Sequence, residues 1–171
     1  LSARAAQTPT ELATTVRSKL LALSRAHEMS LPNPNGDESF QEKSITLFQL
    51  LSDTLVPYEI DGARWWDLKG DDLRINGEKL TSLALLFHEF ATNSAKYGSL
   101  STFEGKLDIV VAVNDDMLEL QWSETKGPPV GFGSRLEQMI AQSLQAQISR
   151  NWQSHGLTIR LAMPVQILAS G

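Results

Sequence analysis

The chain has 171 residues, 42% of them apolar and 20% charged, with no cysteine and a formal net charge of −5. This length suits one domain, or one domain with a small appendage, while the lack of cysteine excludes disulfides and thiolate sites and favours the cytoplasm. The acidic balance argues against nucleic acid as a partner, and no apolar run approaches the roughly 20 residues that cross a membrane. Because the chain begins with Leu1 rather than Met, we expect it to be a fragment of a longer protein.

The first predicted element is a helix that Thr8 can cap and whose first turn contains Pro9. Its apolar face repeats every three or four positions, at Leu12, Val16, Leu20, Leu23 and His27. This face predicts packing either against the same domain or in a bundle shared with another subunit. The next segment, LPNPNGD at 31–37, is predicted to be a loop and hinge. We therefore divide the chain into a helical region with its linker, 1–36, and a folded domain, 37–171.

Helices and strands alternate in the second region. A helix is expected at 44–56, with Ile45, Phe48, Leu51 or Leu55 on its buried side and Pro57 as its stop. The expected elements that follow are strands at 64–68 and 72–75, a helix at 80–97 closed by Gly98, strands at 106–113 and 117–122, a helix at 134–146, and strands at 147–152 and 157–163. This order predicts an α/β sandwich with a mixed sheet and helices on one face.

The predicted helix at 80–97 has two different faces. One face is apolar, formed by Leu80, Leu83, Ala84, Phe87 and Ala91. Glu89, Asn93 and Lys96 follow i, i+4, i+7 spacing and share the opposite side. An amide oxygen can complete the coordination of Mg²⁺, a lysine can contact phosphate, and a glutamate can accept a proton. A solvated helix face and a phosphoryl-transfer site both explain these three residues.

A second unusual stretch, LQWSETKGPPVGFGSRLEQ, covers 120–138. Glu124, at the end of a predicted strand, can accept a hydrogen bond from an exocyclic amine such as that of adenine. Three glycines follow, Gly127, Gly131 and Gly133. Glycines let the backbone approach a ligand closely, and N–H groups at the start of the helix from Ser134 favour phosphate. An ordinary turn between a strand and a helix would contain similar residues.

Together these stretches resemble the ATP-binding domain of the GHKL superfamily, and specifically the HWE group of bacterial sensor histidine kinases. HEFATNSAKYG matches the motif with the family's histidine, and Trp122-Ser123-Glu124 matches its W-x-E motif. GPPV and GFGSRL resemble its glycine-box region, LLALSRAHEMS resembles the end of its dimerisation and phosphoacceptor region, and GLTIRLAMP resembles its closing strand. The resemblance covers nearly the whole chain, with the motifs in the family's order.

The resemblance implies a Bergerat-type two-layer α/β sandwich with a mixed sheet, preceded at 1–36 by a helical remnant of the dimerisation region. ATP and Mg²⁺ are the implied ligands: Asn93 would coordinate the metal and Lys96 would contact phosphates. Glu89 would help activate the accepting imidazole, and Glu124 would read adenine. The other implied nucleotide-binding residues are Tyr97, which packs on the nucleotide or on the core, and Gly127, Gly131, Gly133 and Ser134. His88, off the polar side, would hold the helix or lid in place.

Two departures from the family are visible. The family's phosphoacceptor histidine lies in an H-R-x-K-N type motif that is absent here, and neither His27 nor His155 replaces it. We therefore expect the substrate histidine to lie upstream of this chain. The segment between GPPV and GFGSRL, the ATP lid, is also shorter than in the family, so the lid is either truncated or partly omitted from the sequence.

The leading hypothesis is the catalytic domain of a sensor histidine kinase. It would transfer the γ-phosphoryl group of ATP to the upstream histidine and thence to an aspartate of a response-regulator receiver domain, with a homodimer expected for the full-length protein. The alternative is an ATP-independent adapter or phosphotransfer scaffold that docks a response regulator, favoured by the short lid. A serine/threonine kinase of the same superfamily is a third hypothesis, which the W-x-E motif and the helical N-terminal stretch make less favourable.

Overall fold

The computed structural model describes residues 45–59, 63–125 and 135–169, together with Thr10, Arg17, Leu20 and Ser24. These four residues are helical, as predicted, and the Leu20 side chain is 60% exposed. The other members of the predicted first helix and the loop at 31–37 lie outside the described residues. The division of the chain near residue 36 therefore stays a prediction.

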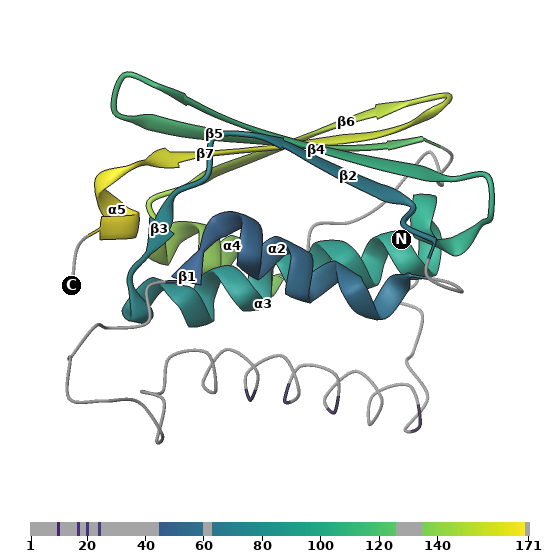
Figure 1. Ribbon diagram of the computed structural model, residues 1–171, viewed down its shortest axis with the longest axis horizontal. Helices are drawn as coiled ribbons and strands as arrows, with labels where there is room; N and C mark the ends of the chain where they lie inside the picture. Colours follow the sequence, from purple (N-terminus) through teal and green to yellow (C-terminus); the bar gives the residue numbers. More distant parts are fainter. Residues whose placement is uncertain are drawn as a thin grey trace, which may run out of the picture.

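A mixed sheet forms one layer of the domain, with the strand order β2-β4-β5-β7-β6. β2 pairs with β4 in parallel, and the other neighbours are antiparallel. The strands are β2 (Trp66–Gly70), β4 (Lys106–Asn114), β5 (Met117–Thr125), β6 (Gln147–Gln153) and β7 (Gly156–Pro164). Figure 1 shows the helices α2, α3 and α4 together beneath one face of this sheet. The predicted two-layer sandwich with a mixed sheet is confirmed.

The second layer consists of helices, and a small two-stranded sheet stands beside it. The helices are α2 (Leu47–Leu55), α3 (Gly77–Tyr97), α4 (Arg135–Ser143) and α5 (Gln166–Ala169), with 3-10 turns η1 (Val56–Tyr58) and η2 (Ser99–Ser101). The small sheet pairs β1 (Ile45–Thr46) with β3 (Arg74–Ile75) in antiparallel orientation. Within the described residues, no helix is both long and apolar enough to span a bilayer.

Two helices begin at other positions than predicted, in each case because of a side-chain cap. The helix expected at 44–56 begins at Leu47, since β1 pairs with β3 and the Thr46 hydroxyl accepts a hydrogen bond from the Gln49 N–H. The helix expected at 80–97 begins at Gly77, since the Asn76 side chain accepts a hydrogen bond from the Glu78 N–H. An extra turn therefore precedes the predicted start of α3.

The strands predicted at 64–68 and 72–75 are shifted or shortened. β2 runs from Trp66 to Gly70 because its register is set by β4, where Trp66 lies opposite Leu107. Gly70 has φ +107, and a Cβ there would lie 1.8 Å from the Val111 carbonyl oxygen. The pairing of β2 with β4 ends at Gly70, and only Arg74–Ile75 of the second predicted strand forms a strand. The strands predicted from residue 106 onward are confirmed, each within three residues of its predicted ends.

The core lies between the sheet and the helices. The apolar face predicted for α3 is buried at Leu80, Leu83, Ala84, Phe87 and Ala91, and Leu86 and Phe90 are buried as well. On α2, Leu51 and Leu55 are buried as predicted, with Leu47 and Leu50, whereas Phe48 is half-buried. Burying one side chain of this kind stabilises a fold by about 1.5–3 kcal/mol. This packing holds α3, and therefore its polar face, at a defined position under the sheet.

Candidate nucleotide site

The polar face of α3 lies away from the core, as the spacing predicts. Glu89 and Asn93 are half-buried and Lys96 is exposed. Tyr97, in the last turn, is 61% exposed, which excludes the predicted alternative that its ring packs in the core. An acid, an amide, an ammonium and an aromatic ring therefore follow one another toward the C-terminal end of α3.

Glu124 stands at that same end of α3, although it comes from β5. One carboxylate oxygen, Oε1, accepts a hydrogen bond from Trp122 Nε1 at 2.9 Å, and Oε2 accepts one from the Ser99 N–H at 3.0 Å. Only 5% of Glu124 is exposed. Residues i and i+2 of a strand share a face, so Trp122 and Glu124 both point to the helix layer. The W-x-E motif is thus a hydrogen-bonded unit that ties the end of β5 to the turn after α3.

Gly98 is at the C-cap of α3, but not in the left-handed conformation that a C-terminal glycine commonly adopts. Its φ is −108 and its ψ −153, an extended conformation open to other residues. A Cβ on Gly98 would lie 1.8 Å from Glu124 Oε2, and one on Gly156 would lie 1.8 Å from the Glu124 carbonyl oxygen. Because these two glycines have no side chain, they leave room for Glu124. The sequence analysis predicted this role for neither glycine.

The Trp122 side chain is fully buried, so it packs in the core. Its ring meets Phe90 of α3 edge-on, with centroids 5.7 Å apart. Ser94, in the last turns of α3, lies with its hydroxyl 3.2 Å from that of Ser99. These contacts fix the C-terminal part of α3 against the end of β5.

His88 lies on a different side of α3 from the polar residues. Its Nε2 is 3.4 Å from the Thr92 hydroxyl, which is 3.5 Å from the Tyr58 hydroxyl in η1. Both distances are long for hydrogen bonds. The position agrees with the prediction that His88 lies off the polar side, and its proposed role in holding the helix or lid stays a prediction.

Four predicted phosphate contacts cannot be placed. Gly127, Gly131, Gly133 and Ser134 all lie outside the described residues, and α4 is described from Arg135. Among the described residues, no group of three or more histidine, cysteine, aspartate or glutamate side chains could hold a metal ion. Any Mg²⁺ held by the described residues would therefore need other ligands besides the Asn93 amide.

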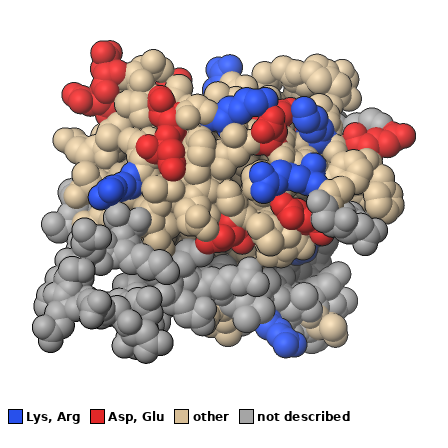
Figure 2. All heavy atoms as spheres, viewed as in Figure 1, with Lys and Arg blue, Asp and Glu red and all other residues tan. Residues whose placement is uncertain are grey.

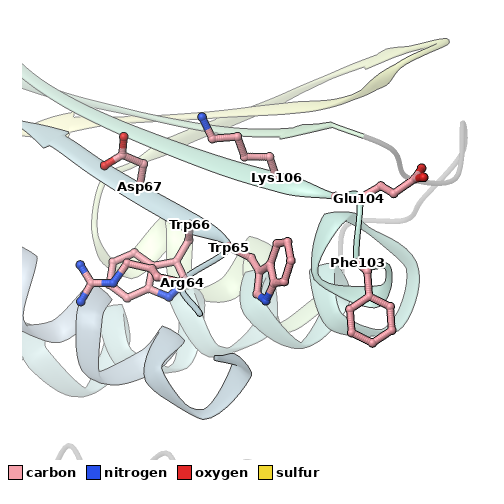
Figure 3. Close-up of a pocket in the computed structure, with 8 residues that line it drawn as sticks. Arg64, Trp65, Trp66, Asp67, Phe103, Glu104 and Lys106 are labelled. Carbon is pink, nitrogen blue, oxygen red and sulfur yellow. The ribbon is translucent and has the colours of Figure 1, made fainter. Parts of the chain in front are cut away.

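A cavity of about 440 Å³ lies elsewhere, at the start of β2 and β4 (Figure 3). It is lined by Arg64, Trp65, Trp66, Asp67, Phe103, Glu104, Gly105 and Lys106. The rings of Trp65 and Phe103 meet edge-on at 6.4 Å, and the Arg64 guanidinium lies 4.1 Å from the centre of the Trp66 ring. The cavity contains neither Asn93 nor Glu124, so it is distinct from the polar end of α3. Sequence analysis predicted none of its lining residues as functional.

Charged side chains are interspersed on the face of the molecule in Figure 2, with no large patch of one sign. On β2, Lys69 Nζ lies 2.5 Å from Asp67 Oδ2. This hydrogen bond with the lysine ammonium lowers the pKa of Asp67, and the Asp67 carboxylate raises the pKa of Lys69. Both groups are exposed to solvent, so this ion pair belongs to the outer surface of the sheet and not to the candidate site.

No family model matches the chain, but comparisons with individual proteins find similar sequences and similar solved structures. A protein of Brucella ovis named blue-light-activated histidine kinase is 31% identical over 158 residues, which cover 86% of this chain and 31% of that protein. The histidine kinase domain of the Erythrobacter litoralis EL346 blue-light activated histidine kinase superposes with a TM-score of 0.64 at 15% identity, over 91% of this chain and 79% of that one. The histidine kinase ThkA, in complex with the response regulator TrrA, superposes with a TM-score of 0.54 at 13% identity, over 92% of this chain and 61% of that one.

The fold is therefore that of a histidine-kinase catalytic domain, with the polar side of α3 and the W-x-E unit at one end. The sequence relationship makes the assignment specific: the chain belongs to the histidine kinases. It spans about a third of the length of the Brucella relative.

Proposed function

We propose that this chain is the ATP-binding catalytic part of a sensor histidine kinase that transfers the γ-phosphoryl group of ATP to a histidine outside this chain. The observation that carries the proposal is the face of α3 on which Glu89, Asn93 and Lys96 stand clear of the core. A solvated helix face alone does not require the W-x-E unit that locks the end of this helix to β5.

The donor set at this face fits a nucleotide that brings its own metal. Mg²⁺ usually keeps several waters and binds protein through one or two oxygens together with substrate phosphates, and an amide oxygen from Asn93 suits that role. Lys96, exposed one turn further on, can meet the phosphates as a point charge. When bound, Mg²⁺ would neutralise charge on the transferred phosphoryl group. Glu89, three residues before Thr92 on α3, is the proposed acid that orients and activates the accepting imidazole.

The base end of the nucleotide is assigned to Glu124 and Tyr97. Each Glu124 oxygen accepts one hydrogen bond from the protein and retains a second acceptor position, so a further bond from the adenine amine is chemically compatible. The exposed Tyr97 ring offers a surface for stacking. The backbone around Gly127, Gly131 and Gly133, together with Ser134, which precedes Arg135 at the described start of α4, remains the proposed phosphate-binding segment.

The proposed transfer needs partners outside this chain. His155, the one histidine in the turn between β6 and β7, is exposed and does not lie in a phosphoacceptor motif. We propose that the accepting histidine lies on a helical dimerisation region of which residues 1–36 are the end, in a homodimer of the full-length protein. The complex of ThkA with TrrA supports a response-regulator receiver domain as the final acceptor.

Calorimetry with a non-hydrolysable ATP analogue and Mg²⁺ tests the proposal. We expect the unaltered chain to bind in the micromolar range and Asn93→Ala to lose binding, because the metal loses its only amide ligand on α3. Asn151→Ala, at an exposed position of β6, is the matched control and should bind normally. Absence of binding in all three proteins would overturn the catalytic proposal and favour the adapter that docks a response regulator without ATP.

A further inference from the structure

The two edges of the sheet differ in charge. β2 forms one edge and β6 the other, and each pairs with a single neighbour among the described strands. The β2 edge carries Asp67 and Lys69, whose side chains are 44% and 66% exposed. Charged side chains on an edge strand, lysine above all, hinder its pairing with another chain. The β2 edge is therefore protected against such pairing.

The β6 edge lacks this protection. The strand is seven residues long, against five for β2, and contains no proline. Its exposed side chains are all uncharged, and they belong to Gln147, Ser149, Asn151 and Gln153. Its one charged residue, Arg150, is half-buried and pairs with Glu137 of α4. No exposed charge on β6 therefore opposes the approach of another strand.

The turn between β6 and β7 determines which backbone groups of β6 are free. It has two residues, and Gln153 lies opposite Gly156 across it. At the base of so short a turn the two residues can only exchange both of their backbone hydrogen bonds, and bonded and non-bonded pairs alternate from there along an antiparallel ladder. Every second residue therefore bonds to β7, while Ile148, Arg150 and Trp152 direct their N–H and C=O groups to the outer edge. Among the described residues, no other strand pairs with this edge.

The sequence of β6, QISRNWQ, is complementary to itself. When two β6 strands pair antiparallel with Arg150 opposite Arg150, the outward backbone groups of the two copies meet. The opposed side chains match in kind: glutamine with glutamine, isoleucine with tryptophan, and serine with asparagine, for the pairs 147–153, 148–152 and 149–151. Like charges directly opposite one another destabilise a strand pair, but each arginine is neutralised by Glu137 of its own copy.

The apolar residues of β6 give a second, independent reason for a partner at this edge. Ile148 and Trp152 alternate with the exposed residues and share the face of Arg150, yet both are only half-buried. Leu161, which lies opposite Ile148 on β7, is 1% exposed. A second β6 would bring its tryptophan beside Ile148 and its isoleucine beside Trp152, so both side chains would lose contact with water. Pairs of an aromatic and a β-branched side chain favour the association of neighbouring strands.

We propose that the free edge of β6 is a docking surface for β6 of a second copy of this chain, paired antiparallel about Arg150, so that the two sheets become one continuous sheet. A seven-residue strand pair is a small interface, and the dimer of this chain alone is therefore weak and transient. In the homodimer proposed for the full-length protein, two tethered copies would meet at an effective concentration in the millimolar range. The inference does not depend on nucleotide binding.

Cysteine cross-linking tests the register, because the chain contains no cysteine of its own. Ser149→Cys and Asn151→Cys are prepared separately and mixed in a glutathione redox buffer. In the proposed pair, positions 149 and 151 of different copies form a non-hydrogen-bonded pair with Cα atoms about 4.5 Å apart, within the range of a disulfide. Two copies of position 149 are diagonal neighbours roughly 7–8 Å apart, too far for a disulfide without backbone movement.

We expect intact-mass spectrometry to find several-fold more of the mixed disulfide dimer than of either self-linked dimer. Val110→Cys, at an exposed position of β4 in the interior of the sheet, measures random cross-linking when it is mixed with Ser149→Cys. A mixed dimer of 149 and 151 no more abundant than this control would overturn the inference.

Sedimentation equilibrium tests the association itself. The unaltered chain should dimerise reversibly as its concentration rises to about 1 mM, the concentration that tethering would give. Ser149→Lys/Asn151→Lys places two exposed charges on the edge, so it should remain monomeric with an unchanged urea midpoint of unfolding. The matched control, Val110→Lys/Met117→Lys, adds the same charge at exposed positions of β4 and β5 and should still dimerise. An unaltered chain that stays monomeric throughout would overturn the inference, and so would a dimer that persists in the Ser149→Lys/Asn151→Lys variant, because it would form through another surface.

Discussion

Replacing Gly98 by alanine tests the W-x-E unit most directly. The new Cβ would lie 1.8 Å from Glu124 Oε2 and 2.9 Å from Ser94 Cα, distances that real Cβ atoms do not adopt. The Gly98 φ of −108 suits alanine, so the cost comes from displacement of the Glu124 carboxylate and of the backbone at Ser94, and not from an unfavourable φ. A displaced Glu124 loses its bonds from Trp122 Nε1 and the Ser99 N–H. Hydrogen bonds to charged groups contribute about 1.5–3 kcal/mol each, so we expect the free energy of unfolding to fall by about 3–6 kcal/mol.

That loss is a large part of the roughly 5–15 kcal/mol that stabilises an ordinary domain. Urea unfolding followed by circular dichroism measures it as a lower midpoint at an unchanged slope. Gly77→Ala is the matched control, because nothing lies within 4 Å of a Cβ at that first helical position. Alanine there should raise the free energy of unfolding by about 0.4–1 kcal/mol. A Gly98→Ala midpoint equal to that of the unaltered chain would refute the reasoning, because it would mean that Glu124 moves aside without cost.

Three further predictions concern the base site, the core and the sheet surface. Because Glu124 is proposed to accept a hydrogen bond from the adenine amine, Glu124→Gln should lower the affinity for an ATP analogue more than the affinity for a GTP analogue, as measured by calorimetry. Equal losses for the two analogues would mean that Glu124 only accepts the hydrogen bonds from Trp122 and Ser99 and does not contact adenine. Phe87→Ala, at a fully buried position, should lower the free energy of unfolding by about 3–5 kcal/mol in urea titration while adenosine affinity persists. Because Lys69 lowers the pKa of Asp67, their interaction stabilises the fold above the unfolded-state pKa of Asp67 and is lost as pH falls through the folded-state pKa. Lys69→Met should therefore raise the Asp67 pKa in an NMR titration, and an unchanged pKa would contradict the assignment.

The two faces of α3 could be predicted because helical spacing alone determines them. Leu80, Leu83 and Phe87 recur at helical intervals, and Glu89 and Asn93 fall on the other side whatever the helix packs against. The start of the same helix was predicted three residues late. Gly77 is a poor helix former, but the Asn76 side chain caps the helix directly before it, and this cap was not part of the prediction.

The structural roles of Gly98 and Glu124 could not be predicted, because they depend on contacts with residues distant in sequence. Local spacing places Trp122 and Glu124 on one face of a strand, but the second donor to the carboxylate, Ser99, lies 25 residues earlier. Gly98 was interpreted as a helix terminator, a local role, whereas its structural reason is the space taken by Glu124. Arg150 similarly stands in an alternating strand pattern that contains no indication of Glu137.

The placement of buried polar groups links these observations. Within the described residues, four polar or charged side chains are buried: Ser94, Ser99, Glu124 and Glu137. Burying such groups is unfavourable unless they are hydrogen-bonded, so a core selected only for stability would have little reason to contain them. Yet they stand in the last turns of α3, in η2, at the end of β5 and in the first turn of α4, the elements that border the proposed nucleotide site. Apolar packing determines which layers form, whereas these directional contacts determine how the end of α3, the end of β5 and the start of α4 are oriented relative to one another. A substitution deep in the apolar core should therefore change the stability of this domain more than its nucleotide affinity, and a substitution among these four residues should change both.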